Sequence, residues 1–163
     1  MPGWYAVTSV KWLTAIELTA APFEGFFQKR RYVYEWEQPD GTTTIEPVRL
    51  QQVRSIITEP ASDATVPRGD VVIRGVAWSG AASIAGVEVS IADGPWQPAR
   101  MVGDRRRHAW QWWELITHFE TAGETRVRAR ATDLAGRVQP EKPRWNRLGY
   151  GSNAIQTVTI IVG

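Results

Sequence analysis

The stretch Thr125-Arg-Val-Arg-Ala-Arg-Ala-Thr-Asp133 decides the fold, because its side chains alternate strictly between two kinds. In a β-strand, successive side chains point to opposite faces of the sheet. Val127, Ala129 and Ala131 therefore share one face, which is small and apolar and fits a protein core. The three arginines between them lie on the other face, which fits water or the carboxylates of a partner. The stretch predicts a strand that a second layer of structure covers on one side.

The segments around this stretch also resemble short strands separated by turns. Val87-Glu-Val-Ser-Ile91 alternates in the same way and ends at Asp93-Gly94-Pro95, so the residues that follow can return beside it as a hairpin. We expect strands at residues 54–58, 71–78, 87–91, 96–101, 110–119, 125–133 and 156–162. Seven or so short strands in about 100 residues are typical of an immunoglobulin-like β-sandwich. No helical period separates them, which argues against a parallel α/β fold.

The segment from Trp110 to Phe119 is apolar on both of its faces. Its alternation changes phase between Trp112 and Trp113, which indicates either a bulge or a strand that is packed on both sides. The chain holds nine tryptophans in all, and such large side chains are typical of cores and of protein interfaces. We expect most of them in the core and the rest on a surface that a partner covers.

The first 52 residues follow a different pattern. Val7 to Ala20 carries many β-branched residues and a weak helical period, so we expect strands there rather than a helix. Gln38-Pro-Asp-Gly-Thr42 is a turn signal. The segments beside it, 32–36 and 42–48, are either short strands or an irregular excursion. We therefore divide the chain into a first part, residues 1–52, and a sandwich, residues 53–163.

Composition excludes several classes of function. The chain has no cysteine, which rules out disulfides, a cysteine nucleophile and a thiolate metal site within it. Its formal charge of +2 is small for a nucleic-acid binder, and no apolar run reaches the roughly 20 residues of a membrane span. The clusters Lys29-Arg30-Arg31 and Arg105-Arg106-Arg107 are best explained as solvated charges, while a role for one of them in binding phosphate or another anion stays open.

Catalytic motifs are also missing from the sequence. His108 and His118 have no companion at a metal-ligand spacing and are better explained as surface residues. The Gly-x-Ser-x-Gly elbow of hydrolases and the glycine-rich phosphate loops do not occur. Glu114 lies between apolar residues, and we expect it to pair with an arginine such as those of the 125–133 strand.

Several short motifs occur in an order that points to one family. From the N-terminus they are Pro2-Gly3-Trp4-Tyr5, Ser9-Val10-Lys11-Trp12-Leu13-Thr14, Pro22-Phe23-Glu24-Gly25-Phe26-Phe27-Gln28, Ser55-Ile-Ile-Thr-Glu-Pro60, Ala77-Trp78-Ser79-Gly80, Trp110-Gln-Trp-Trp-Glu114, Ala129-Arg-Ala-Thr-Asp133, Gln139-Pro140 and Trp145-Asn146-Arg147. In this order they resemble the C-terminal region of the sulfite oxidase-type molybdenum cofactor oxidoreductases, and the third motif is similar to the bacterial branch. The resemblance covers nearly the whole chain.

The resemblance implies a mainly β chain, in which an immunoglobulin-like (E-set) sandwich forms a homodimer and follows a short remnant of the molybdopterin-binding domain. In the family, the molybdenum–molybdopterin cofactor transfers an oxygen atom in a two-electron step, while the protein binds and orients. The match assigns Ser9, Val10 and Lys11 to cofactor contact. Lys11 would reach the phosphate of the cofactor, for which an ammonium group is a suitable donor.

Two departures from the family pattern limit what this chain does. The cysteine that ligates the metal in the family lies upstream of the matched region, so we expect this chain to bind no cofactor and to catalyse no reaction by itself. Trp78-Ser79-Gly80 runs into Ala81-Ala82 without the arginine that helps true sulfite oxidases to bind their substrate, which leaves the substrate of the parent enzyme open. The N-terminus lacks a signal-peptide pattern and resembles the middle of a protein. The compartment, periplasmic or cytoplasmic, is open as well.

The leading hypothesis is a dimerisation module of a molybdenum-dependent oxidoreductase, with a self-interface lined by tryptophan and arginine and with no nucleic-acid or membrane partner. An alternative is a free-standing immunoglobulin-like module that binds a carbohydrate or a protein through exposed tryptophans. A third is a chain that docks onto a separately encoded cofactor-domain chain. Residues 1–52, which we call the first strip, distinguish the first two hypotheses, because a stand-alone binding module has no reason to retain Ser9-Val10-Lys11-Trp12.

Overall fold

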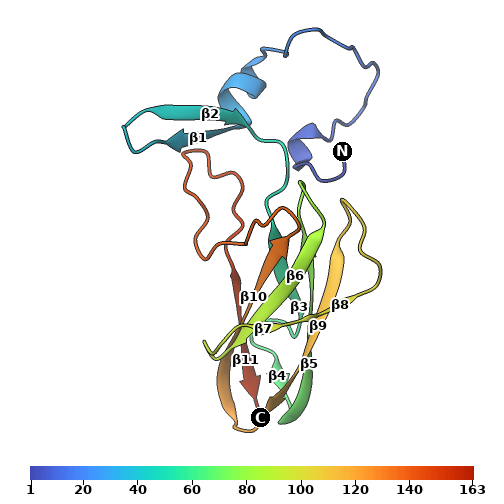
Figure 1. Cartoon of the computed structure of the whole chain (residues 1–163), viewed down its shortest axis with the longest axis vertical. Coiled ribbons are helices and arrows are strands. Elements are labelled where there is room, and N and C mark those ends of the chain that lie inside the picture. The colour runs from blue at the N-terminus through green and yellow to red at the C-terminus, as the bar shows by residue number, and fades with distance from the viewer.

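The computed structural model describes every residue from Met1 to Gly163, and the chain is mainly β-structure (Figure 1). Two sheets pack face to face as a sandwich. The N-terminal residues and a separate two-stranded hairpin lie at one end of the sandwich, and the C-terminus lies at the opposite end. The expected mainly β sandwich is confirmed. None of the helices has the length and apolar character needed to cross a membrane.

The larger sheet is built around β10, which lies antiparallel between β6 and β11. Two very short strands form its edges, β7 beside β6 and β4 parallel to β11. In spatial order the strands are β4 (Thr65–Val66), β11 (Gln156–Val162), β10 (Gly123–Asp133), β6 (Ile84–Ile91) and β7 (Gln97–Pro98). The alternation read from β10 is confirmed, because Val127, Ala129 and Ala131 are completely buried.

The smaller sheet is antiparallel throughout. In spatial order its strands are β3 (Arg54–Glu59), β5 (Gly69–Trp78), β9 (Gln111–Phe119) and β8 (Arg100–Val102). The pairing of β5 with β9 runs without interruption from Gly69 opposite Phe119 to Ala77 opposite Gln111. There is no bulge in this pairing, so the change of phase at Trp112 and Trp113 reflects an outward face that is itself partly apolar.

The segment after β6 differs from the single hairpin arm expected over residues 96–101. Its first two paired residues, β7, lie beside β6 in the larger sheet, and β8 then lies beside β9 in the smaller one. The backbone N–H of Ala99 still donates to the carbonyl oxygen of Val87 in β6 at 2.9 Å, and from Arg100 the chain pairs with β9 instead. The chain thus crosses between the layers within one short segment.

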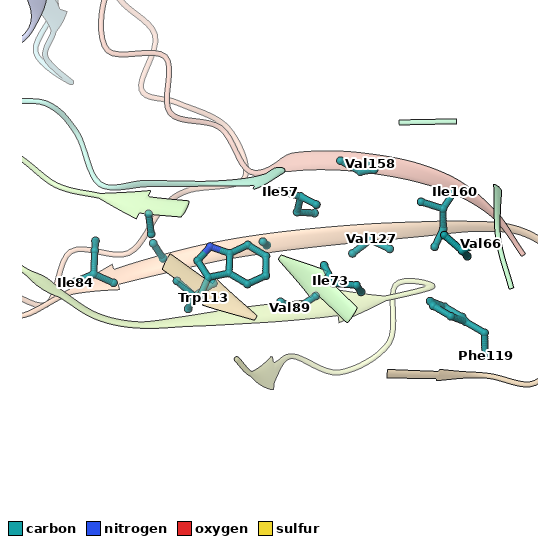
Figure 2. Packing of buried hydrophobic residues seen from close by; sticks show 14 of the residues in the cluster. Ile57, Val66, Ile73, Ile84, Val89, Trp113, Phe119, Val127, Val158 and Ile160 are labelled. Atoms are coloured by element: carbon teal, nitrogen blue, oxygen red, sulfur yellow. The ribbon is translucent and has the colours of Figure 1, made fainter. Parts of the chain in front are cut away.

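The centre of the core is occupied by the indole ring of Trp113, which is 1% exposed. Figure 2 shows this ring between the two layers, near Ile73 and Val89. Gly75 provides the room, because a Cβ atom there would lie 2.2 Å from Trp113 Cζ2 and 2.2 Å from the carbonyl oxygen of Ile56. A glycine in the middle of a strand marks such a close approach.

Two buried polar side chains fix the connections around this core. The carboxamide oxygen of Gln139 accepts hydrogen bonds from the backbone N–H groups of Ser55 at 2.7 Å and Ala131 at 3.2 Å, and so joins β3 to β10. The carboxylate of Asp133 accepts hydrogen bonds from the Ser79 hydroxyl and from the Arg137 guanidinium. Burial alone would raise the pKa of Asp133, but the hydrogen bonds from Arg137 and Ser79 outweigh it, and the pKa is lowered.

The first part of the chain has its own small apolar cluster, formed by Tyr34, Trp36 and Val48. Its elements are a 3-10 helix η1 (Ala6–Thr8), a π-helical turn η2 (Phe27–Arg31), and the hairpin of β1 (Val33–Glu37) and β2 (Thr43–Pro47). Of the two alternatives for residues 32–48, the short strands are therefore correct.

The strands expected within Val7 to Ala20 are absent, and that prediction is wrong. After η1 the backbone runs as an irregular segment whose side chains are exposed, with Trp12 at 95% and Leu18 at 96%. β-branched residues favour a strand where they can pack on a pleated, half-buried surface beside a partner strand. No sheet edge lies beside this segment, so the local preference has nothing to pair with.

Replacing Gly75 by alanine tests the packing of Trp113. The new methyl group would collide with the backbone of β3 as well as with the indole ring, and we expect the free energy of unfolding to fall by about 3 kcal/mol or more. Gly86→Ala on β6 is the matched control, because a Cβ atom there meets nothing within 4 Å. We expect it to change the stability by less than about 1 kcal/mol. Urea unfolding followed by tryptophan fluorescence measures the stability of both variants. An equal loss of unfolding free energy in the two variants would contradict this account.

The lowered pKa of Asp133 predicts the pH dependence of stability. A carboxyl group with a lower pKa in the folded state stabilises the fold fully above its unfolded pKa, and this contribution is lost as the pH falls through the folded value. Asp133→Asn should therefore destabilise the protein by about 2 kcal/mol near neutral pH. The difference in unfolding free energy between this variant and the unmodified protein should become smaller as the pH falls below 3.8. Asp104→Asn, at a side chain 85% exposed, is the control. The assignment would be refuted if the difference in unfolding free energy between Asp133→Asn and the unmodified chain stayed constant at every pH.

Candidate functional site

The two outer faces of the sandwich have opposite characters. On the larger sheet, the three arginines of β10 project outward and find carboxylates within the same chain. Arg126 pairs with Asp93, Arg128 with Asp93 and Glu141, and Arg130 with Glu88. Trp96 lies under two of them, with the Arg130 guanidinium 4.3 Å from its ring centre. This face is neutralised by the chain's own carboxylates, so it needs no carboxylates from a partner.

The outer face of the smaller sheet is exposed and partly apolar. The outward residues of β9 alternate with the buried ones, and Trp112 is 49% exposed and Ile116 62% exposed. Val72 of β5 lies opposite Ile116. At the end of the face Trp110 packs against Trp78, with ring centres 6.1 Å apart. We call this surface the tryptophan face, and its outward residues are Asp70, Val72, Arg74, Trp110, Trp112, Glu114, Ile116 and His118.

Charged pairs lie within the tryptophan face. The carboxylate of Glu114 lies between Arg100 of β8 and Arg74 of β5, at 3.7 Å from the Nε atom of Arg74. The hydrogen bond from Arg100 lowers the pKa of Glu114. Beside them, the Nδ1 atom of His118 lies 2.7 Å from Asp70. The expectation that Glu114 pairs with an arginine is confirmed, but its partners are Arg74 and Arg100. The arginines of β10, which were named as examples, belong to the other sheet and pair elsewhere.

The residues assigned to cofactor contact follow η1 directly. Ser9, Val10 and Lys11 all lie in the exposed segment, and Val10 is 71% exposed. Lys11 forms no ion pair with any residue of the chain, so its ammonium group is available to an anion. The residue type and its exposure fit a contact to a phosphate group.

The metal does not fit the residues that are present. The chain has no cysteine, and no three histidine, cysteine, aspartate or glutamate side chains come together as a metal-binding group. His108 and His118 lie apart, one in the loop before β9 and the other near the end of β9. We therefore derive no catalytic step for a metal in this chain.

Sequence reasoning missed a cleft of about 410 Å³ between the hairpin and the sandwich. Its lining includes Trp36 from β1 and the side chains of Arg137 and Arg144 from the connection between β10 and β11. The two sides are held together by Arg147 of that connection, which donates two hydrogen bonds to the carboxylate of Glu35. The first cause of the lowered pKa of Glu35 is this hydrogen bonding. The residues of the cleft lie about 100 positions apart in the sequence, and no local motif announces them.

Comparison with known proteins places this architecture in a family. The family model of the Mo-co oxidoreductase dimerisation domain matches residues 47–163. Sulfite oxidase from Gallus gallus is 32% identical over 167 residues, which are 94% of this chain and 36% of that protein. Mitochondrial sulfite oxidase from Homo sapiens is 33% identical over 176 residues, which are 99% of this chain and 32% of that protein. The chain thus spans about a third of the length of these relatives.

A solved structure agrees with the sequence comparison. The sulfane dehydrogenase SoxCD from Paracoccus pantotrophus superimposes with a TM-score of 0.83 at 28% sequence identity. The match covers 97% of this chain and 42% of the chain of that enzyme, so it includes the hairpin and the first strip as well as the sandwich. The chain belongs to the family of Mo-co oxidoreductase dimerisation domains.

Proposed function

We propose that this chain is the C-terminal, dimer-forming part of a molybdenum-dependent oxidoreductase and that it has no catalytic activity of its own. The observation that carries the proposal is the family match over residues 47–163. It is supported by relatives that are about three times as long as this chain, which covers 36% and 32% of them. The chemistry of the parent, a two-electron transfer of an oxygen atom, would then belong to residues outside this sequence. We also place the parent in the bacterial branch, on the resemblance of the motif at residues 22–28.

The division of the chain is part of this proposal. We assign residues 1–52 to the last strip of a molybdopterin-binding domain and residues 53–163 to the dimerisation domain. The presence of two separate apolar clusters supports the division, since Tyr34, Trp36 and Val48 pack apart from the core around Trp113. In such a parent the molybdenum–pterin group supplies the redox chemistry, and Lys11 of the first strip donates to its phosphate.

The tryptophan face is the surface that we assign to the homodimer. A two-fold interface brings the same patch of each protomer together, so that patch must complement itself. Trp112 and Ile116 provide apolar area, and Glu114 between two arginines provides charges of both signs. Interfaces of this kind are rich in tryptophan and arginine. The arginine face of the larger sheet is the weaker candidate, because the outward side chains of its central strand β10 are all polar or charged and provide little apolar area.

A free-standing binding module is the second candidate function. It is favoured by Trp110 and Trp145, which are each 66% exposed and could stack against a sugar ring or a protein. The retained first strip with Lys11 argues against it. The third possibility, docking onto a separate cofactor-domain chain, would use the surface of that same strip.

Ile116→Glu tests the homodimer. A carboxylate in the middle of the self-complementary patch would meet its own copy across the two-fold axis, and we expect the protein to become monomeric. Ile161→Glu is the matched control, because Ile161 of β11 is also an outward isoleucine, 45% exposed, on the opposite sheet. Sedimentation velocity gives the mass of each variant against the 18.3 kDa of one chain. A chain that is monomeric before substitution, or that loses its dimer in the Ile161→Glu variant instead, would refute the assignment.

Lys11→Gln tests the cofactor contact, and it must be made in the full-length protein. Loss of one charge-assisted hydrogen bond to a phosphate should weaken retention of the cofactor roughly tenfold. The molybdenum content per polypeptide after dialysis measures this without relying on activity. Lys142→Gln, at another exposed lysine, should leave the content unchanged. An equal molybdenum content in both variants would mean that Lys11 is an ordinary surface residue.

A further inference from the structure

The cleft between the hairpin and the sandwich is lined by two arginines, one of which has no carboxylate partner. Arg137 and Arg144 both line it, and Glu46 is the one carboxylate in the lining. The Oε2 atom of Glu46 accepts a hydrogen bond from the indole N–H of Trp36 at 3.1 Å, and Glu46 forms no ion pair with either arginine. Arg137 is neutralised by Asp133, which lies behind it, whereas no carboxylate of the chain pairs with Arg144.

Arg137 is fixed in place by contacts that leave part of its guanidinium free. Its Nε and Nη2 atoms donate to the Oδ2 atom of Asp133 at 2.9 and 2.6 Å, and Nη2 also donates to the Ser79 hydroxyl at 2.9 Å. The Nη1 atom makes no hydrogen bond. Asp133 is completely buried, so the guanidinium is anchored on the protein side while 37% of the Arg137 side chain stays exposed. A rigid donor of this kind is well suited to bind an oxyanion.

Arg144 has no carboxylate partner at all. Its guanidinium carbon lies 4.3 Å from the centre of the Trp36 ring, which is the geometry of a cation–π contact. The contact occupies a face of the guanidinium and leaves its N–H edges for hydrogen bonding. Trp36 in turn stacks on Tyr34, with ring centres 4.7 Å apart and 14° between the ring planes. The two aromatic rings thus form a firm support for a charged group that is otherwise exposed.

We propose that this cleft binds a small oxyanion, a carboxylate or a phosphate group, between Arg137 and Arg144. A guanidinium group presents two parallel N–H donors that match the oxygens of either group. The volume of about 410 Å³ suits a small molecule rather than a polymer. The lining comes from β1, from β2 and from the connection after β10, and both arginines belong to that connection. The site does not depend on the function proposed above.

The test is a titration of the 163-residue chain with inorganic phosphate and, separately, with succinate. Proton–nitrogen correlation NMR follows the indole N–H of Trp36, which is assigned by its loss in Trp36→Phe. We expect a saturable shift of this signal in the millimolar range. Tighter binding of phosphate identifies a phosphate site and tighter binding of succinate a carboxylate site. Shifts that grow linearly with both anions and never saturate would overturn the proposal.

Arg144→Gln separates the site from a general response to salt. Arg144 is exposed and makes no hydrogen bond, so the variant should fold normally and bind the anion at least tenfold more weakly. Arg107→Gln removes another exposed arginine without a carboxylate partner, outside the cleft, and should change the affinity less than twofold. Equal anion affinity in Arg144→Gln and the unmodified chain would overturn the proposal. An equal loss of affinity in Arg144→Gln and Arg107→Gln would overturn it as well.

Discussion

The packing of one indole ring between the two sheets is the constraint on which the rest of the structure depends. Trp113 fills the centre of the core, and Gly75 opposite it on β5 has no side chain because the ring takes that space. Across the sandwich, β10 contributes small residues, Ala129 and Ala131, at completely buried positions. A large residue on one strand and small residues on its neighbours fill the interior at the density that folded proteins require. The orientation of β9 is fixed in this way.

A fixed β9 also determines the outer surface. Because side chains alternate along a strand, burial of Trp113 forces Trp112, Glu114 and Ile116 outward on the smaller sheet. The same rule on β10 sends three arginines outward on the larger sheet, where the chain supplies its own carboxylates. One layer therefore ends in a neutralised polar face and the other in the tryptophan face. The family to which the chain belongs is a family of dimerisation domains, and the tryptophan face is the surface that would benefit from being covered.

The sequence predicts those features that depend on short-range alternation. β10 and β11 could be located closely because apolar and polar residues alternate in register with the pleat. The failures all concern pairings that no local pattern encodes. Val7 to Ala20 has the residue types of a strand but no neighbouring edge, and Glu114 finds Arg74 and Arg100 because of the order of strands in the sheet. The cleft is a further case, since Trp36 and Arg144 meet only through the docking of the hairpin on the connection after β10. The assignment of Ser9, Val10 and Lys11 rests on resemblance and stays a prediction.

The central claim, that two copies of this chain associate through the tryptophan face, is tested most directly by measuring distances within the assembly. The chain has no cysteine, so a single introduced cysteine gives one spin label per protomer. One label replaces His118 at the rim of the tryptophan face, and in a second protein one label replaces Thr157, which is exposed on the outer face of the larger sheet. Pulsed dipolar spectroscopy then gives the distance between the two copies of each label. The account predicts a short, narrow distance for position 118 and a much longer one for position 157. The reverse order, or no dipolar coupling at position 118, would contradict it.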